Sequence, residues 1–234
     1  MGRAKTEKRG EFDIESAMCA RIRFAVSAGG LPPGAKLPEE LVAESFATSR
    51  ARVRSAFQRL AFEGLVDLER NRGAFVARPS VKEAKELFEA RRVIERVTTE
   101  IVTRTILTHD LRRLSRHVAE SKPHWIRANR QVAISSVSAF HLSLAALAHN
   151  AALTTALERL IIRTSLILGL YATGRTFAAL PDAYDTLMDL IASGESLNAA
   201  RQMERCLLAI ETGLEFLQPA RPNIDLKRQM WMVG

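Results

Sequence analysis

The sequence predicts a mainly α-helical protein, in which a winged helix-turn-helix with a small β-hairpin precedes an all-α helical bundle. Three observations support this fold class. Apolar residues recur at helical spacing up to Gly64, two strand-like runs separated by a Gly-containing turn follow, and helical spacing without a strand signal fills the rest of the chain. We therefore expect a winged helix-turn-helix domain at 1–78, an all-helical domain at 79–218 and a C-terminal tail at 219–234.

The composition fits a globular protein that has an anionic partner. The 234 residues are enough for two domains, 47% of them are hydrophobic, and the formal net charge is +8. Such a charge favours nucleic acid or acidic lipid, and by itself it does not separate the two. Because Cys19 and Cys206 lie far apart in the sequence, we expect two buried thiols and a reducing, cytoplasmic location.

No segment predicts export or a membrane span. The N-terminal residues are basic and then mixed in charge, and no apolar stretch of the signal-peptide type follows them. Residues 131–157 lack Asp, Glu, Lys and Arg over a length that could cross a bilayer, but their serines, histidines and asparagine are costly in hydrocarbon. We expect buried helices there and no membrane contact.

The first two elements are expected to be helices joined by a rigid loop. Residues 12–28 carry apolar side chains on one helical face, and Gly29 and Gly30 end that pattern; the face consists of Ile14, Met18, Ile22, Ala25 and Val26. The loop LPPGAKLPEE contains three prolines and a glycine. After it, Leu41, Val42 and Phe46 predict a short second helix.

The third element is a basic helix followed by a hairpin. Ser49 is a favourable N-cap, the helix ends at Gly64, and its apolar face consists of Val53, Ala56, Phe57 and Leu60. The opposite, exposed face consists of Arg52, Arg54, Ser55, Gln58 and Arg59. The runs LVDLE and AFVAR, with RNRG between them, predict two strands and a tight turn.

Basic residues are concentrated in this region. Between Ser49 and Arg78 the sequence has seven arginines and three acidic residues, and Arg50, Arg52 and Arg54 have no acidic residue four positions away along the helix. Phosphate would supply the missing counter-charge, so the position of the charge favours nucleic acid.

The second domain is predicted to be entirely helical. Ser80 and Glu83 form a capping-box pattern at the start of a long helix whose apolar face consists of Leu87, Val93, Ile94, Val97 and Ile101. Further helices are expected near 109–120, 127–148, 151–171, 181–193 and 196–216, separated by Pro123, Gly174, Pro181 and Gly194. The tail is interrupted by prolines, and we expect little regular structure in it except a short amphipathic end with Trp231.

The segment LPPGAKLPEELVAESFATSRARVRSAFQRLAFEGLVDLERNRGAFV resembles the N-terminal domain of GntR-type transcription regulators. The resemblance implies that the third helix enters the major groove of DNA and that the wing approaches the neighbouring minor groove. The positions that match the DNA contacts of that family are Ser49, Arg50, Arg52, Arg54, Arg72 and Gly73. Arg50 and Arg54 are suited to reading guanine, and Ser49 and Arg52 to holding phosphates. For Arg59 and Arg70 the alternative interpretation is that they are solvent-exposed residues without a DNA contact.

The second half resembles the FCD effector domain of the FadR-like branch of these regulators. The matching pieces are FEARRVIE, FHLSLAALAHNAAL and LMDLIASGESLNAARQM, and about six helices resemble the shorter, VanR-type form. The resemblance implies a homodimer, an operator of double-stranded DNA with inverted half-sites, and a small-molecule effector that changes how the two DNA-binding heads are spaced.

The metal site of many FCD domains is largely replaced in this sequence. That site uses Asp-x-x-x-His and two later histidines separated by 21 residues, and of these His141 is retained, while Val137, Tyr184 and Cys206 stand at the other three positions. Valine donates nothing to a metal, and the remaining set is poor for a hard or borderline ion. We therefore predict no metal and no cofactor.

An effector pocket without metal needs other groups to hold its ligand. Arg91 and Arg163 are candidates for binding an organic acid, and the candidate effector-binding residues are Arg91, His141, Arg163, Tyr184 and Cys206. Interhelical salt bridges are the alternative for the two arginines, a core histidine is the alternative for His141, and a long apolar effector is also compatible with the sequence.

The predicted function is that of a homodimeric repressor controlled by a small molecule. One alternative is a constitutive regulator whose effector pocket is degenerate. An enzyme has less support, because the chain contains no P-loop, G-x-G-x-x-G, H-E-x-x-H or G-x-S-x-G pattern.

Overall fold

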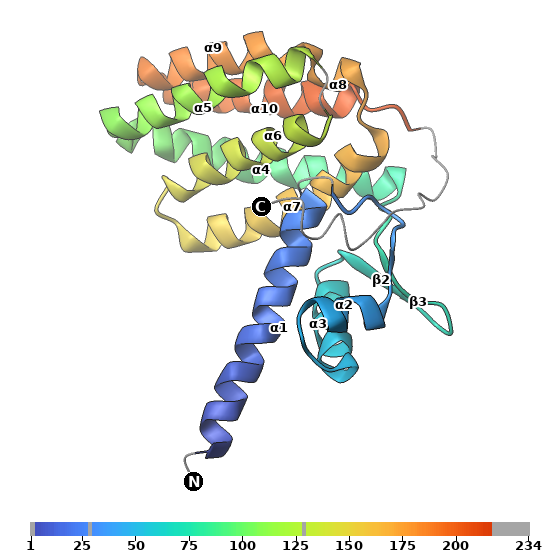
Figure 1. Cartoon of the computed structure of the whole chain (residues 1–234). Coiled ribbons are helices and arrows are strands. Elements are labelled where there is room, and N and C mark those ends of the chain that lie inside the picture. The colour runs from blue at the N-terminus through green and yellow to red at the C-terminus, as the bar shows by residue number, and fades with distance from the viewer. Residues whose placement is uncertain (1–2, 28–29, 128–129, 217–234) are drawn as a thin grey trace. The chain divides into compact units, whose positions relative to one another are not determined.

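The structure is a computed structural model that describes residues 3–27, 30–127 and 130–216 (Figure 1). The contacts divide the chain after Arg78 into two compact units. Each unit is described by itself below. The predicted tail, including Trp231, lies outside the described residues.

The first unit is a helix-turn-helix with a small sheet. Its elements are α1 (Arg3–Ser27), β1 (Lys36–Leu37), α2 (Glu39–Ser45), α3 (Arg50–Phe62), β2 (Val66–Glu69) and β3 (Gly73–Val76). The three strands are antiparallel in the order β1-β3-β2, with Lys36 opposite Phe75 and Glu69 opposite Gly73. The predicted winged helix-turn-helix is therefore confirmed.

Two predictions for this unit, the start of the first helix and the absence of a strand in the loop, were wrong. The first helix begins at Arg3 and not near residue 12, and the predicted loop contains the strand β1. This strand is two residues long and is defined by its pairing with β3. Such a pairing joins residues far apart in the chain, so no local sequence pattern predicts it.

The core of the first unit is formed where α1 packs on α3. Met18 and Ile22 of α1 and Val53, Phe57 and Leu60 of α3 are almost completely buried. Arg23 of α1 donates from Nε to Glu63 at the end of α3 over 2.7 Å. This pair and the apolar contacts hold α3 against its support, so that its other side is available.

The second unit is a bundle of helices, as predicted. Its elements are α4 (Val81–Thr105), α5 (Thr108–Ile126), α6 (Arg130–Ala146), α7 (Ala151–Tyr171), α8 (Gly174–Ala178), α9 (Leu180–Ala192) and α10 (Ser196–Thr212). Helix α4 packs against α10, α7 and α6, so it is central to the bundle. The described residues contain seven helices here and not six, because α8 forms one short turn of helix where Gly174 suggested a break.

Two features of α4 and α5 also differ from expectation. Helix α5 continues past Pro123 to Ile126, since the buried Trp125 anchors its last turn by donating from Nε1 to Ser136 Oγ over 3.0 Å. The predicted capping box of α4 is half formed: Ser80 Oγ accepts from the Glu83 backbone N–H at 3.1 Å, but the Glu83 carboxylate pairs with Arg163.

The buried face of α4 is largely polar. Val93 and Val97, which were predicted to face the core, are 64% and 45% exposed, respectively. The positions that α4 turns inward include Arg91, Glu95 and Thr99. Apolar periodicity therefore predicted the wrong buried face for this helix, because the side that packs inward carries charged residues.

Candidate nucleic-acid interface and buried polar cluster

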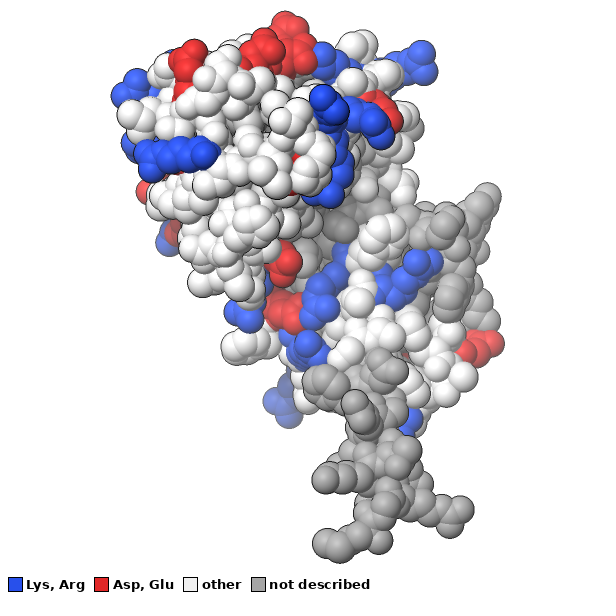
Figure 2. Space-filling view, turned by 90° about the vertical axis from the view of Figure 1, so that its left-hand side faces the viewer, with Lys and Arg blue, Asp and Glu red and all other residues white. Residues whose placement is uncertain are grey.

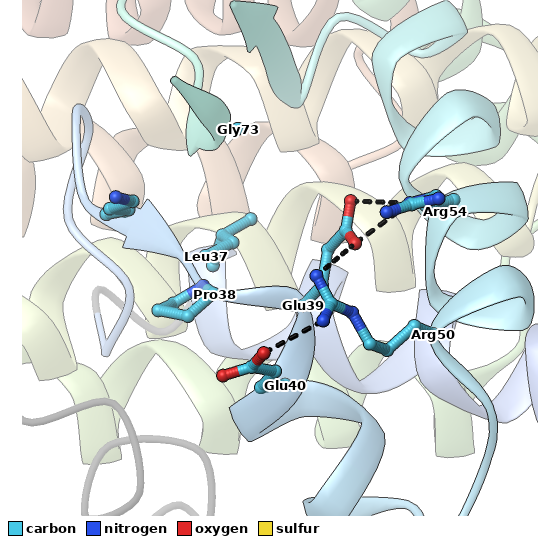
Figure 3. A pocket seen from close by; sticks show the side chains of 8 residues that line it. Leu37, Pro38, Glu39, Glu40, Arg50, Arg54 and Gly73 are labelled. Atoms are coloured by element: carbon cyan, nitrogen blue, oxygen red, sulfur yellow. Dashed lines mark hydrogen bonds and ion pairs between the residues drawn. The ribbon is translucent and has the colours of Figure 1, made fainter. Parts of the chain in front are cut away.

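The first candidate site is the surface where the N-terminal turns of α2 and α3 meet the wing. Ser49 caps α3 by accepting from the Arg52 backbone N–H at 3.4 Å. Arg50 and Arg54, one turn apart on α3, have side chains that are 54% and 61% exposed. They border a hollow of about 330 Å³ (Figure 3) lined by Lys36, Leu37, Pro38, Glu39, Glu40, Arg50, Arg54 and Gly73. We call these eight residues the reading face.

The arginines of the reading face have acidic partners on the neighbouring helix. Arg54 Nε donates to both carboxylate oxygens of Glu39, over 3.0 and 2.8 Å. Arg50 donates from Nη1 to Glu40 over 2.8 Å, and its Nη2 lies 3.5 Å from Glu39 (Figure 3). Arg50 and Arg54 therefore have counter-charges within the protein, on α2, although neither has an acidic residue four positions away on its own helix.

The Glu39 carboxylate is charged in this arrangement. The hydrogen bond from Arg54 lowers the pKa of Glu39, although burial opposes that change. Exposed ion pairs of this kind contribute at most about 1 kcal/mol each, so a stronger anion can take over the guanidinium groups. The pairs orient the two arginines and leave them able to exchange partners.

The wing contributes Arg72 and Gly73. Arg72, in the turn between β2 and β3, pairs with Glu69, and its guanidinium lies 5.4 Å from the centre of the Phe75 ring. Gly73 has φ +97° and its missing Cβ would meet nothing within 4 Å. Glycine is therefore favoured at this position by the backbone conformation and not by lack of space.

The remaining residues of the predicted basic face are less available. Arg52 is half-buried, whereas the sequence placed it on the exposed side. Arg59 lies near α1, where its Nη1 donates to Ser16 Oγ over 3.4 Å, and it also lies 3.8 Å from Glu63. The structure thus brings Arg50, Arg54 and Gly73 together around one hollow.

Charges of both signs are interspersed on the surface. On the face drawn in Figure 2, Lys and Arg side chains lie beside Asp and Glu side chains in several places. The net charge of +8 is therefore not gathered into a single basic field on that face.

The second candidate site is a set of polar side chains inside the second unit. Arg91 and Glu95 of α4, His141 of α6 and Tyr184 of α9 are at most 1% exposed. We call these four residues the buried cluster. Cys206 of α10 is also fully buried and belongs to the same core as Tyr184.

The members of the buried cluster form one chain of hydrogen bonds. Arg91 donates from Nε to Glu95 over 2.6 Å and from Nη1 to Thr164 Oγ1 over 3.0 Å. The other carboxylate oxygen of Glu95 contacts His141 Nδ1. Tyr184 Oη lies 2.7 Å from His141 Nε2. Each ring nitrogen of His141 therefore has a protein partner.

Burial and the neighbouring charges favour one protonation state for each of Glu95, His141 and Tyr184 in the buried cluster. Burial alone would raise the pKa of Glu95, but Arg91 and His141 outweigh that effect and lower the pKa to about 2. Burial lowers the pKa of His141 against the opposing influence of Glu95, and burial raises the pKa of Tyr184 well above 10. We assign a neutral imidazole that donates from Nδ1 to the Glu95 carboxylate and accepts from the Tyr184 hydroxyl at Nε2.

This cluster does not fit a metal ion. Both nitrogens of His141 are engaged, and Val137 offers no donor. Burial raises the pKa of Cys206 to about 12, so this residue is a thiol that lies 3.5 Å from the Ala183 carbonyl. Among the residues that the structure describes, no three His, Cys, Asp or Glu side chains lie together as an ion site.

Four of the five predicted effector residues lie together in the structure, and one lies apart from them. Arg91, His141, Tyr184 and Cys206 lie together, but Arg163 pairs with Glu83 and its side chain is 33% exposed. Glu95 was missed by the sequence analysis; its position four residues after Arg91 is the signal that could have found it. Within the described part of the chain, Arg91 Nη2 is buried without a hydrogen-bond partner.

A winged helix-turn-helix with exposed arginines, followed by an all-helical unit, defines a DNA-binding regulator with a separate regulatory domain. Residues 15–76 match the model of the bacterial regulatory proteins of the gntR family, and residues 86–209 match the FCD domain. The chain belongs to the GntR family, in the group whose members carry an FCD domain. It is a DNA-binding transcription regulator, and its family and fold are those of regulators and not of enzymes.

Solved structures share this fold. The Escherichia coli McbR/YncC structure matches with a TM-score of 0.75 and 16% identity, over 85% of this chain and 97% of that chain. A putative GntR transcriptional regulator from Rhodococcus sp. RHA1 matches with a TM-score of 0.73 and 23% identity, over 85% of this chain and 95% of that chain. In the described residues, none of the helices has the length and apolar character needed to cross a bilayer.

Proposed function

We propose that this protein is a cytoplasmic, homodimeric repressor that binds an operator with inverted half-sites and responds to a small-molecule effector. The observation that carries the proposal is the reading face, in which two exposed arginines of α3 lie one turn apart beside the wing. Helix α3 enters the major groove, where Arg50 and Arg54 donate to guanine. Ser49 and Arg52 hold phosphates, while Arg72 and the Gly73 backbone contact the DNA through the wing.

Glu39 prepares the two arginines for this role. It contacts both guanidinium groups, and its own side chain is only 22% exposed. The arginines are therefore partly ordered before DNA arrives, which reduces the entropy lost on binding. Guanine and phosphate then replace the weaker, exposed part of each ion pair.

The homodimer is proposed to form through the outer face of α4. Val93 and Val97 are exposed there, one turn apart, and Glu86 and Arg104 lie on the same helix on either side of them. A two-fold axis midway between the valines would place Val93 against Val97 of a second copy, and Glu86 near Arg104 of that copy. One two-fold arrangement therefore pairs the valines with each other and the glutamate with the arginine.

The effector is proposed to be an organic acid that reaches Arg91. The unpartnered Nη2 of Arg91 supports an anion at this position. The internal pairing of Arg91 with Glu95, and of Glu95 with His141, favours the second candidate function, a constitutive regulator. The two are separated by measuring operator binding against a panel of small carboxylates: release or tightening supports the first, and no change with any of them supports the second.

The DNA-binding proposal is tested on operators selected from a random duplex library with the full-length chain. Arg50→Ala or Arg54→Ala should weaken operator binding by about 5- to 150-fold, because each removes a guanine contact of about 1–3 kcal/mol. Arg116→Ala is the control, since Arg116 is exposed on α5. Selection of no specific sequence, or full operator affinity in an Arg50→Ala/Arg54→Ala double variant, would contradict the proposal.

The dimer is tested separately by sedimentation. Val93→Glu combined with Val97→Glu should produce monomers, because two buried carboxylates would face each other across the axis. Leu197→Glu on α10 is the control, as Leu197 is equally exposed but lies on another helix. An unchanged dimer in the double variant would rule out this interface.

A further inference from the structure

Glu40 is an exposed acid on the reading face, which is expected to meet a polyanion. It belongs to the first turn of α2, and its side chain is 76% exposed. It lines the same hollow as Arg50, Arg54 and Gly73 (Figure 3). An acidic residue on this surface is unfavourable unless it has a role in binding, because DNA phosphates repel a carboxylate.

Glu40 and its neighbour Glu39 have different surroundings. Glu39 is mostly buried and contacts both Arg50 and Arg54. Glu40 pairs with Arg50 Nη1 through Oε1 at 2.8 Å (Figure 3), and most of its side chain is exposed. Glu39 therefore suits a positioning role, whereas Glu40 can itself contact a ligand in the hollow.

A carboxylate that is enclosed against DNA loses its water. This loss costs free energy unless the carboxylate accepts hydrogen bonds from a donor of the DNA. The donors in the major groove are the exocyclic amino groups of cytosine and adenine. Glu40 thus favours sequences that place such an amino group in the hollow and penalises the others.

The pairing with Arg50 distinguishes between the two amino groups. The guanidinium of Arg50 has donors for two neighbouring acceptors, and Glu40 beside it offers an acceptor. A G·C pair presents two acceptors, N7 and O6 of guanine, followed by the N4 amino donor of cytosine. An A·T pair interrupts its acceptors with the N6 donor, so it matches this order less well.

We propose that Glu40 is a specificity-determining residue, which reads a G·C base pair together with Arg50 by accepting a hydrogen bond from the N4 amino group of cytosine. This inference rests on the proposed function, since it requires α3 to lie in the major groove. According to this proposal, Glu40 determines which base pair is preferred at one operator position, and Arg50 and Glu40 both contact that base pair.

The inference is tested by selecting operators from a random duplex library with full-length wild-type protein, Glu40→Ala and Glu40→Gln. Preference for one G·C pair should fall about tenfold in Glu40→Ala, while the other positions keep their preferences. In Glu40→Gln the same position should shift toward adenine, which glutamine reads through N6 and N7. A residue with a purely structural role would not change the preferred base at one position.

Two further readings complete the experiment. Binding of Glu40→Ala to non-operator DNA should become severalfold tighter, because one negative charge has left the interface. Glu120→Gln, an equal change of charge on exposed α5, should leave both the selected sequence and the non-operator affinity unchanged. Circular dichroism verifies that each variant is folded.

The results separate this inference from the proposed function. If wild-type protein selects an operator and Glu40→Ala selects the same base at every position, Glu40 does not determine specificity and the inference is overturned, while the DNA-binding role stands. If wild-type protein selects no sequence at all, the proposed function fails, and the inference fails with it.

Discussion

Replacing Glu95 with glutamine removes the negative charge that faces the buried guanidinium of Arg91. The two side chains are 2% and 0% exposed and lie 2.6 Å apart on neighbouring turns of α4. Glutamine has nearly the same shape and can still accept from Arg91, so the variant tests the charge and not the packing. We expect the second unit to be strongly destabilised.

The size of the effect follows from two estimates. The pKa of Glu95 is lowered from 4.5 to about 2. This shift corresponds to about 3 kcal/mol in favour of the charged form. Leaving one partner of a buried ion pair uncompensated typically costs about 3–5 kcal/mol. A loss of about 3 kcal/mol in the free energy of unfolding corresponds to roughly 10 °C in melting temperature for a domain of this size.

The assay is urea denaturation followed by the fluorescence of Trp125. This residue is buried in the second unit with its ring 5.0 Å from the Tyr184 ring, so its emission reports unfolding of that unit. A Trp231→Phe background leaves Trp125 as the single tryptophan of the chain. Glu100→Gln is the matched control, because Glu100 and Arg104 are also four residues apart on α4, but Arg104 is 59% exposed. That control should cost less than about 1 kcal/mol.

A double variant separates charge from hydrogen bonding. Arg91→Met together with Glu95→Gln removes both charges and should recover at least half of the loss, as apolar or neutral replacements of buried pairs often do. The reasoning would be refuted if Glu95→Gln cost no more than Glu100→Gln. It would also be refuted if the double variant were less stable than Glu95→Gln alone.

Three other substitutions or conditions have defined outcomes. Acidification should destabilise the second unit below pH 6.5, because the lowered pKa of His141 makes the folded chain take up this proton less readily than the unfolded chain. The loss, of up to about 1.4 kcal/mol per pH unit for each such proton, should steepen below pH 4.5, because unfolded Glu95 protonates there and folded Glu95 stays charged down to about pH 2. Urea midpoints that stay constant between pH 7 and pH 5 would contradict this. Gly213→Ala should cost about 1–3 kcal/mol in thermal unfolding, since its Cβ would lie 2.6 Å from the Thr176 backbone, and an unchanged melting temperature would disprove the clash. Ser49→Ala should cost about 0.5–1 kcal/mol, the low end for a lost N-cap because that hydrogen bond is 3.4 Å long, and stabilisation of the first unit in urea would be inconsistent with the capping role.

The elements of the first unit were predictable because their signals are local. Ser49 is the N-cap of α3, the spacing of Val53, Phe57 and Leu60 defines its buried face, and the turn before Gly73 separates two short strands. Each of these features depends on residues within a few positions along the chain. The fold class of both halves could therefore be predicted from the sequence.

The charged contacts were not predictable in the same way. Arg50 and Arg54 find their acids on α2, ten and fifteen positions earlier in the chain. His141 meets Glu95 and Tyr184, which lie 46 and 43 positions away. Pairs of this kind depend on how helices pack, and a helical wheel includes only neighbours on the same helix.

Helix α4 illustrates both what the local sequence determines and what only tertiary packing decides. Its sequence determined that a helix begins after Ser80 and continues for several turns, because capping and helical propensity act within the segment. Which side of that helix faces inward was decided by the tertiary structure, which buries Arg91 and Glu95 and exposes Val93. Burial of the charged pair is possible because Thr164 and His141, which lie on other helices, hydrogen-bond to Arg91 and Glu95, and no pattern along α4 indicates those partners.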